Sequence, residues 1–179
     1  NHAIRLNPNL ANAYYNKGNA LRELQRYDEA IAAYDHAIRL DSNYATAYYN
    51  KGYTLDDLQR YDEAIAAYDH AIRLDPNYAN AYYNKGIALY NLKRYDEAIA
   101  AYDHAIRLNP NYATAYQNKG DVLRELKHYE EAILAHDHAI RLNPNFADAY
   151  QNKGVALQNL GRRDEAQQAF QKARELGFK

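Results

Sequence analysis

The sequence contains no cysteine, no methionine and no tryptophan, and Ser42 is its single serine. Without cysteine, the chain can form neither a disulfide framework nor a cysteine-ligated metal site. This composition suits a reducing compartment, and we expect a cytoplasmic location. The sequence also lacks an obvious carboxylate pair, glycine-rich loop or zinc motif, and it offers almost no nucleophile. It therefore predicts no enzymatic activity, no catalytic or metal-binding residues and no cofactor.

An excess of one charge and long apolar runs are also missing. The chain has 22 Lys and Arg against 23 Asp and Glu, so its formal net charge is −1. Proteins that bind nucleic acid through the phosphates usually carry a strong basic excess. No stretch approaches the roughly 20 apolar residues that are needed to span a bilayer. The sequence thus predicts neither a nucleic acid nor a membrane as partner.

Internal repetition is the feature that the sequence has in abundance. The tripeptide Asn-Lys-Gly recurs every 34 residues, beginning at Asn16, Asn50, Asn84, Asn118 and Asn152. This spacing predicts five tandem repeats at residues 11–44, 45–78, 79–112, 113–146 and 147–179. Residues 1–10 are predicted to be the tail of an earlier repeat, so we expect further repeats upstream. Positions are counted below from the first residue of each repeat.

Each repeat contains two amphipathic patterns of helical period. In the first pattern, Tyr14, Gly18 and Leu21 share one face. The second pattern runs from position 17 to position 30, and in the second, third and fourth repeats a proline, which cannot continue a helix, follows at position 32. The asparagine at position 33 is predicted to cap the next helix, as at Asn43 and Asn77. One such helix pair cannot bury its apolar face alone, so neighbouring pairs are expected to stack.

The third repeat carries the pattern Tyr82, Gly86, Leu89, Tyr95, Ala98, Tyr102, Ala105 and Pro110. This pattern resembles the tetratricopeptide repeat, with tyrosine where tryptophan is usual, and the resemblance covers the whole chain at the period of that family. It implies an all-α fold, a right-handed superhelical solenoid of antiparallel helix pairs. First helices would line the concave face and second helices the convex face. A fold does not by itself establish a function.

The repeats differ mainly on the first-helix face opposite the core. Arg26–Leu40 recurs unchanged as Arg60–Leu74 and Arg94–Leu108, whereas positions 2, 5, 9, 12 and 13 vary among the first four repeats. Position 9 varies most, as Asn19, Tyr53, Ile87, Asp121 and Val155. A constant scaffold with an individual concave face is expected of a binding groove. Drift of solvent-facing positions is the alternative, although the convex face has hardly changed.

Two sets of residues are predicted to form a peptide-binding groove. The asparagines at position 6 would form a ladder that binds a peptide backbone, because an amide offers both a donor and an acceptor. The ladder is similar to that of O-linked N-acetylglucosamine transferase. The second set would form an apolar surface that faces away from the core: Tyr15, Tyr49, Tyr53, Tyr83, Ile87 and Tyr90. There is a competing interpretation for each set. One is that asparagine is simply the common residue at position 6 in this family, and the other is that a tyrosine-rich composition places tyrosines on the surface without a binding role.

The partner is expected to be a protein or peptide that is neutral or basic. Tetratricopeptide repeats that hold acidic chaperone tails use a clamp of basic residues, and here Tyr15, Asn80 and Asn84 stand at three clamp positions. Acidic residues in the predicted groove outnumber the basic ones, Arg22 and Arg124. The alternatives are a structural spacer, a self-association element that forms an oligomer through the repeat ends, or the substrate-presenting array of a larger enzyme.

The last repeat is predicted to be a polar cap. Gln167 and Arg174 replace isoleucine at positions 21 and 28, and Arg163 replaces tyrosine at position 17. Terminal repeats need such a polar outer face because no further repeat covers them. Lysine recurs at position 7, where its stem is expected to pack and its ammonium to reach solvent. His136 stands where other repeats have tyrosine or phenylalanine and is interpreted as a core substitution.

Overall fold

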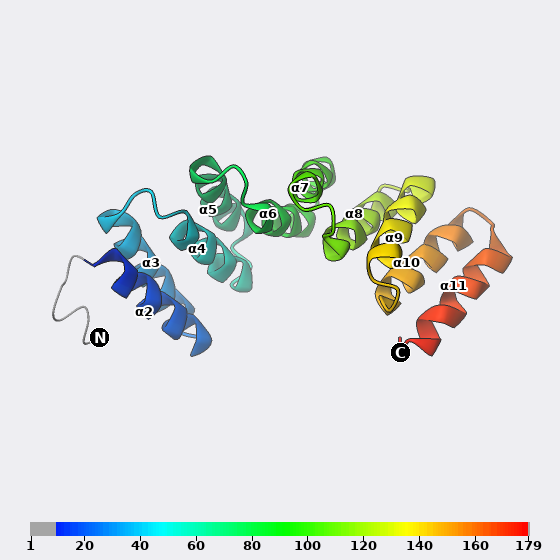
Figure 1. The fold of residues 1–179 in the computed structure, drawn as a ribbon, viewed down its shortest axis with the longest axis horizontal. Helices are drawn as coiled ribbons and strands as arrows, with labels where there is room; N and C mark the ends of the chain where they lie inside the picture. Colours follow the sequence, from blue (N-terminus) through cyan, green and yellow to red (C-terminus); the bar gives the residue numbers. More distant parts are fainter. Residues whose placement is uncertain (1–9, 179) are drawn as a thin grey trace. The chain divides into compact units, whose positions relative to one another are not determined.

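The computed structural model describes residues 10–178, and every regular element in that range is a helix (Figure 1). The predicted remnant at residues 1–10 lies outside the described residues, except for Leu10. Two helices fall within each predicted repeat. In chain order the helices are α2 (Ala11–Glu23), α3 (Tyr27–Leu40), α4 (Ala45–Asp57), α5 (Tyr61–Leu74), α6 (Ala79–Asn91), α7 (Tyr95–Leu108), α8 (Ala113–Glu125), α9 (Tyr129–Leu142), α10 (Ala147–Asn159) and α11 (Arg163–Glu175).

The turn inside each repeat is a left-handed helix cap. Gln25 has a φ of 57° and donates its backbone N–H to the carbonyl of Arg22 at 2.8 Å. The N–H of Arg26 then donates to the carbonyl of Leu21 at 2.9 Å. This pair of hydrogen bonds is the Schellman motif. Glycine adopts the left-handed conformation with least strain, and among these turns only the last uses it, at Gly161 with a φ of 76°.

The turn between repeats differs from the prediction. The backbone N–H of Asn43 donates to Asp41 Oδ1 at 3.0 Å, and that of Asn77 donates to Asp75 Oδ1 at 3.0 Å. The residue that caps α4 is Tyr44, one position after Asn43, and it makes no side-chain capping hydrogen bond. The predicted asparagine N-cap is therefore wrong. The residue two positions before each asparagine organises the turn instead, because its side-chain oxygen accepts a backbone N–H. This residue is Asp41 or Asp75 in unit 1 and Asn109 or Asn143 in unit 2, the two compact units defined below.

The chain forms two compact units, Asn1–Leu92 and Lys93–Lys179, which we call unit 1 and unit 2. In unit 1, α2 packs on α3 and α4 on α5, while α3 contacts α4 and α5 contacts α6. In unit 2, α8 packs on α9 and α10 on α11, while α7 contacts α8 and α9 contacts α10. Within each unit, a second helix therefore also packs on the first helix of the next repeat. Stacked helix pairs share a core in this way.

Glycine at position 8 lets the two helices of a pair approach each other closely. A Cβ atom on Gly18 would lie 2.5 Å from Cε1 of Tyr34, and one on Gly120 would lie 2.6 Å from Cε1 of His136. Both rings are fully buried. The interpretation of His136 as a core substitution is confirmed.

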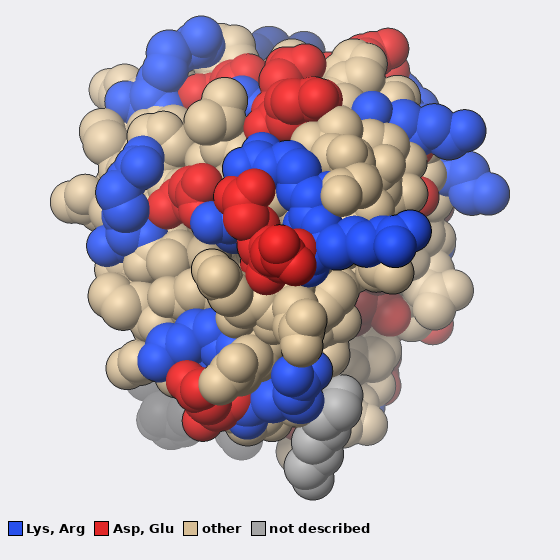
Figure 2. Space-filling model, turned by 90° about the vertical axis from the view of Figure 1, so that its right-hand side faces the viewer, with Lys and Arg blue, Asp and Glu red and all other residues tan. Residues whose placement is uncertain are grey.

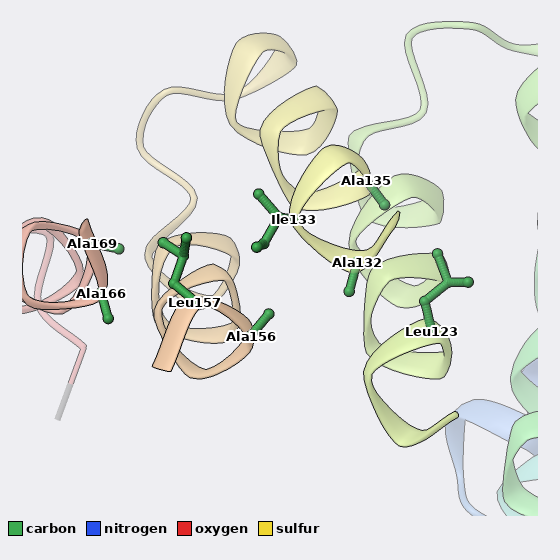
Figure 3. Packing of buried hydrophobic residues seen from close by; sticks show 8 residues of the cluster. All are labelled: Leu123, Ala132, Ile133, Ala135, Ala156, Leu157, Ala166 and Ala169. Carbon is green, nitrogen blue, oxygen red and sulfur yellow. The ribbon is translucent and has the colours of Figure 1, made fainter. Parts of the chain in front are cut away.

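The core of unit 2 continues across its helix pairs. Side chains from α8, α9, α10 and α11 gather into one buried cluster, shown as sticks in Figure 3. Its large members are leucine and isoleucine, and alanines let the helices approach closely. The cluster consists of Leu123, Ala132, Ile133, Ala135, Ala156, Leu157, Ala166 and Ala169.

The recurrent lysine at position 7 makes an ion pair with the preceding repeat. Lys51 Nζ lies 2.7 Å from Asp35 Oδ1, and Lys119 Nζ lies 2.6 Å from Asp103 Oδ1. The same pair recurs between Lys85 and Asp69 and between Lys153 and Asp137. The lysine side chains are about one quarter exposed, so the ammonium links neighbouring helices. The lysine thus has a structural role, but its ammonium pairs with an aspartate instead of only reaching solvent as predicted.

The outer face of α11 is polar. Gln167, Arg174 and Arg163 are all exposed there. Side chains of both charge signs are interspersed over the side of the molecule seen in Figure 2. Whether this face acts as a cap stays a prediction.

Candidate peptide-binding surface

The predicted groove residues of unit 1 lie on its three first helices, α2, α4 and α6. Tyr49 and Tyr53 are four residues apart on α4, and on α6 Tyr83 and Ile87 are also four apart, with Tyr90 three residues further along. Residues at this spacing share one face of a helix. Tyr53 is 37% exposed, which makes it the most exposed of the 20 tyrosines. Tyr83, Ile87 and Tyr90 are half-buried.

Tyr15 and Tyr49 pack into the core, contrary to the prediction that they face away from it. The ring of Tyr49 lies 5.9 Å from that of buried Tyr68 and 4.8 Å from that of Tyr78. The ring of Tyr15 makes the equivalent contacts with Tyr34 and Tyr44. In these two repeats, position 5 therefore fills the space between its own helix pair and the tyrosine that caps the next first helix. The helical wheel missed this because it considers one helix at a time.

The asparagine ladder also has intramolecular partners. Asn50 Nδ2 donates to Tyr15 Oη and to Asn19 Oδ1, both at 3.0 Å. Asn84 Nδ2 donates to Tyr49 Oη at 2.9 Å, and Asn84 is only 7% exposed. These amides tie one repeat to the one before it.

The remaining ladder residues vary in their surroundings. In unit 2, Asn152 Nδ2 donates to Asp121 Oδ1 at 2.7 Å. Asn118 is half-buried and Asn16 is exposed. The placement of Asn84 on an exposed face is wrong, and the peptide-binding role of the ladder stays a prediction.

A buried hydroxyl group in the second repeat lacks a partner. In the first repeat, Tyr34 Oη donates to Asn19 Oδ1 at 2.8 Å and also interacts with the hydroxyl of Thr54. The equivalent hydroxyl, Tyr68 Oη, is fully buried and has no hydrogen-bond partner among residues 10–178. The reason is local, because Tyr53 and Ala88 occupy the positions of Asn19 and Thr54.

Asp56, one turn after Tyr53 on α4, is the second unpartnered group. Its Oδ1 atom is buried without a hydrogen bond, and within the described range Asp56 forms no ion pair. Burial, reinforced by the negative charge of Asp57, raises the pKa of Asp56 to about 6. The nearby cation, Arg22, lies with its Cζ 4.4 Å from the centre of the Tyr53 ring. Arg22 also opposes the rise in the pKa of Asp57 that burial causes.

Unit 2 contains a polar network at the corresponding positions. Asp121 accepts hydrogen bonds from Gln117 Nε2 at 3.1 Å and from Asn152 Nδ2 at 2.7 Å. His136 Nδ1 lies 3.1 Å from Gln117 Oε1, and its Nε2 lies 3.8 Å from Asp121 Oδ1. Burial raises the pKa of Asp121 to about 6, and burial with the charges of Arg124 and Lys153 lowers that of His136 to about 3.

Sequence analysis did not identify this network. The sequence feature that could have revealed the network is a joint change at positions 5, 9 and 24. The second repeat has tyrosine at all three positions, and the fourth has Gln117, Asp121 and His136. The imidazole is neutral at ordinary pH, so the network is held by hydrogen bonds rather than by an ion pair.

A shallow hollow lies between the two helices of the second repeat and of the fourth repeat. In the second repeat, a shallow cavity of about 250 Å³ is lined by Lys51, Leu55, Glu63 and the stacked rings of Tyr48 and His70. The fourth repeat has the equivalent cavity, with the stacked rings of Tyr116 and His138. These hollows are the main competing surface for a partner.

The described residues offer neither a metal-binding cluster nor a membrane-spanning helix. No group of three or more histidine, cysteine or acidic side chains that could hold a metal ion occurs within residues 10–178. None of the described helices has the length and apolar character needed to cross a membrane.

Comparison with known proteins places the chain in a family. Models described as tetratricopeptide repeat match residues 49–113, residues 1–32 and 101–134, and residues 147–176, and a model described as TPR repeat matches residues 18–58 and 120–161. No curated protein shows significant sequence similarity to the chain.

Solved structures agree with these matches. MamA is 34% identical with a TM-score of 0.88, over 93% of this chain and 91% of that one. MamA from Desulfovibrio magneticus RS-1 is 26% identical with a TM-score of 0.87, over 93% and 94%. YrrB, described as a TPR protein with an unusual peptide-binding site, is 30% identical with a TM-score of 0.84, over 98% and 91%. The chain belongs to the tetratricopeptide repeat family.

Proposed function

We propose that the chain is a protein-interaction scaffold that binds an extended peptide segment through unit 1. The binding surface would be the face of its first helices that carries Arg22 on α2, Tyr53 and Asp56 on α4, and Ile87 and Tyr90 on α6; we call it the first-helix face. We propose no catalytic role for this chain, and its cysteine-free composition suits a cytoplasmic setting.

The exposure of Tyr53 is the observation that carries this proposal. Every other tyrosine of the chain is half-buried or buried, whereas Tyr53 is exposed, and it stands at the most variable position of the repeat. The helix that carries Tyr53, α4, contacts α6, which carries Ile87 and Tyr90. Exposed aromatic side chains combine a large apolar area with a polar tip and are enriched at binding hot spots. The peptide-binding relative YrrB gives further support.

The charge of the surface favours a neutral or basic peptide. Asp56 and Asp57 lie on α4 next to Tyr53, and the nearest cation, Arg22, is already placed over the Tyr53 ring. An acidic peptide would add negative charge beside an aspartate that has no cationic partner. A basic peptide would supply the missing partner.

A selection from a random peptide library displayed on phage tests the proposal. We expect the wild-type chain to enrich peptides, and Tyr53→Ala to bind a synthetic copy of an enriched peptide at least tenfold more weakly, because a tyrosine hot spot contributes about 2 kcal/mol or more. Tyr48→Ala is the matched control. Tyr48 is also on α4, but it lines the hollow between α4 and α5.

The control separates the two candidate surfaces. Tyr48→Ala should retain binding within about a factor of two. Loss of binding in Tyr48→Ala but not in Tyr53→Ala would place the site in the hollow and contradict the proposal. Enrichment of no peptide at all would contradict it as well.

A further inference from the structure

Two partly or largely buried aspartates on first helices, Asp56 and Asp121, differ in how their carboxylates are satisfied. Asp121 accepts hydrogen bonds from Gln117 and Asn152, so the fold itself supplies its donors. Asp56 has a buried oxygen with no donor and forms no ion pair within residues 10–178. Buried charged oxygens are normally paired, so an exception needs a physical explanation.

The hydroxyl of Tyr68 is an independent sign that something is missing at the same place. Tyr68 is fully buried, yet its Oη has no hydrogen-bond partner among the described residues. Its ring packs against Gly52, one turn before Asp56 on α4, and the charges of Asp56 and Asp57 raise the pKa of Tyr68 further above its usual value. The hydroxyl and the carboxylate oxygen are thus two unsatisfied groups in the same part of the second repeat.

The chemistry of the two groups indicates what would complete them. A carboxylate accepts hydrogen bonds, and a neutral hydroxyl accepts one and donates one. A lysine ammonium has three donors and an arginine guanidinium has five, so either can satisfy both groups and neutralise the charge. The ring of Tyr53, already contacted by Arg22 at 4.4 Å, is suited to pack against the stem or head of such a side chain.

We propose that Asp56, with the Tyr68 hydroxyl and the Tyr53 ring, is an anchoring subsite for one lysine or arginine side chain of a peptide bound to the first-helix face. This inference rests on the proposed peptide-binding function and adds the residue type that gives the peptide its specificity. The subsite belongs to the second repeat, because no other repeat combines an exposed tyrosine at position 9 with an aspartate at position 12.

The experiment is a phage-display selection run in parallel on the wild type, Asp56→Asn and Asp121→Asn. We expect the wild type and Asp121→Asn to enrich lysine or arginine at one fixed position of the recovered peptides. Asp56→Asn should lose that enrichment. Asp121→Asn is the matched control because it removes a similarly buried carboxylate whose hydrogen bonds are internal.

A synthetic peptide then measures the effect directly. An enriched peptide and its norleucine variant at the basic position are titrated by fluorescence anisotropy at pH 7.5. For the wild type we expect the basic side chain to strengthen binding at least tenfold, and for Asp56→Asn about twofold or less. Tyr68→Phe should weaken binding of the basic peptide by about threefold, with an unchanged circular dichroism spectrum.

The outcomes separate this inference from the proposed function. If the wild type enriches peptides without a basic preference, or if Asp56→Asn keeps the preference, the subsite is wrong and peptide binding stands. A buried water that satisfies Asp56 and Tyr68 would give that result. If the wild type enriches no peptides, both the function and the subsite are wrong.

Discussion

The second repeat, in unit 1, and the fourth repeat, in unit 2, are built on the same kind of helix pair but differ jointly at positions 5, 9 and 24. In the second repeat, positions 5, 9 and 24 are all tyrosine, and they leave one hydroxyl without a partner. In the fourth repeat, the same positions hold Gln117, Asp121 and His136, which mostly bond to one another. Among the described residues, both units keep buried polar atoms without a hydrogen-bond partner, Asp56 Oδ1 and Tyr68 Oη in unit 1 and His136 Nε2 and Arg124 Nε in unit 2. The carboxylates differ, because Asp121 receives hydrogen bonds from Gln117 and Asn152 whereas the buried oxygen of Asp56 receives none.

The largest expected effect concerns position 5. Tyr49→Ala should lower the free energy of unfolding by about 3 kcal/mol, because it removes a ring that packs on Tyr68 and Tyr78. Gln117→Ala should cost about 1.5 kcal/mol, because it removes hydrogen bonds to Asp121 and His136 rather than a large apolar volume. Urea unfolding of both variants tests the comparison. A larger loss in Gln117→Ala would show that unit 2, not unit 1, depends more on this position.

The next expected effect concerns the asparagine ladder. Asn50→Ala should lower the free energy of unfolding by about 1–2 kcal/mol, because Tyr15 and Asn19 each lose a hydrogen bond. Asn16→Ala is the matched control at the same position, and since Asn16 is exposed it should cost about 0.5 kcal/mol or less. Thermal or urea unfolding provides the measurement. Equal costs would mean that the ladder does not tie the repeats together and would favour a role in binding alone.

The pH dependence of stability provides a smaller and more specific test. The pKa of Asp56 in the folded chain is about 6, above the ordinary value near 4. The folded chain therefore holds a proton between about pH 4 and pH 6 that the unfolded chain has released. The free energy of unfolding falls as pH rises through this window. Because Asp56 is partly exposed to solvent, we expect its contribution to be only about 1 kcal/mol.

Replacing the aspartate isolates that contribution. Asp56→Asn should unfold at a higher temperature than the wild type at pH 7.5 and at nearly the same temperature at pH 4. The neighbouring groups that titrate or carry charge are Asp57, Tyr68 and Arg22, and they are identical in both chains. A variant that is less stable than the wild type at pH 7.5 would show that the carboxylate already has a partner, such as a water or Arg22.

The sequence predicted the helix pairs well and the surface of the first helices only in part. The period of 34 residues, the glycine at position 8 and the identity of His136 as a core residue could be inferred because each depends on one helix pair. The burial of Tyr49 and Asn84 could not, because it depends on more than one helix pair. Tyr49 packs on Tyr78, which caps the next first helix, and Asn84 bonds to Tyr49 of the preceding repeat. The lack of a hydrogen-bond partner for the Tyr68 hydroxyl could not be inferred either. It arises because Tyr53 and Ala88, from two different repeats, replace the residues that contact the equivalent hydroxyl of Tyr34.

The smallest expected effect tests whether the two units share one scaffold. Lys51 in unit 1 and Lys119 in unit 2 make the same ion pair with the preceding repeat, at 2.7 Å and 2.6 Å, with similar exposure. Because the ammonium groups are only partly buried, Lys51→Gln and Lys119→Gln should each lower the free energy of unfolding by about 0.5 kcal/mol. Both losses should shrink in 1 M salt, where screening is strong. Glutamine keeps much of the aliphatic stem, so the change removes the charge more than the packing.

Double-mutant cycles with Asp35→Asn and Asp103→Asn measure the pair energies directly. Equal energies would place the difference between the units in the three positions of the second and fourth repeats. A pair energy above about 2 kcal/mol in one unit only would show instead that the stacking of the helix pairs differs, and the comparison would then concern the scaffold and not the binding residues.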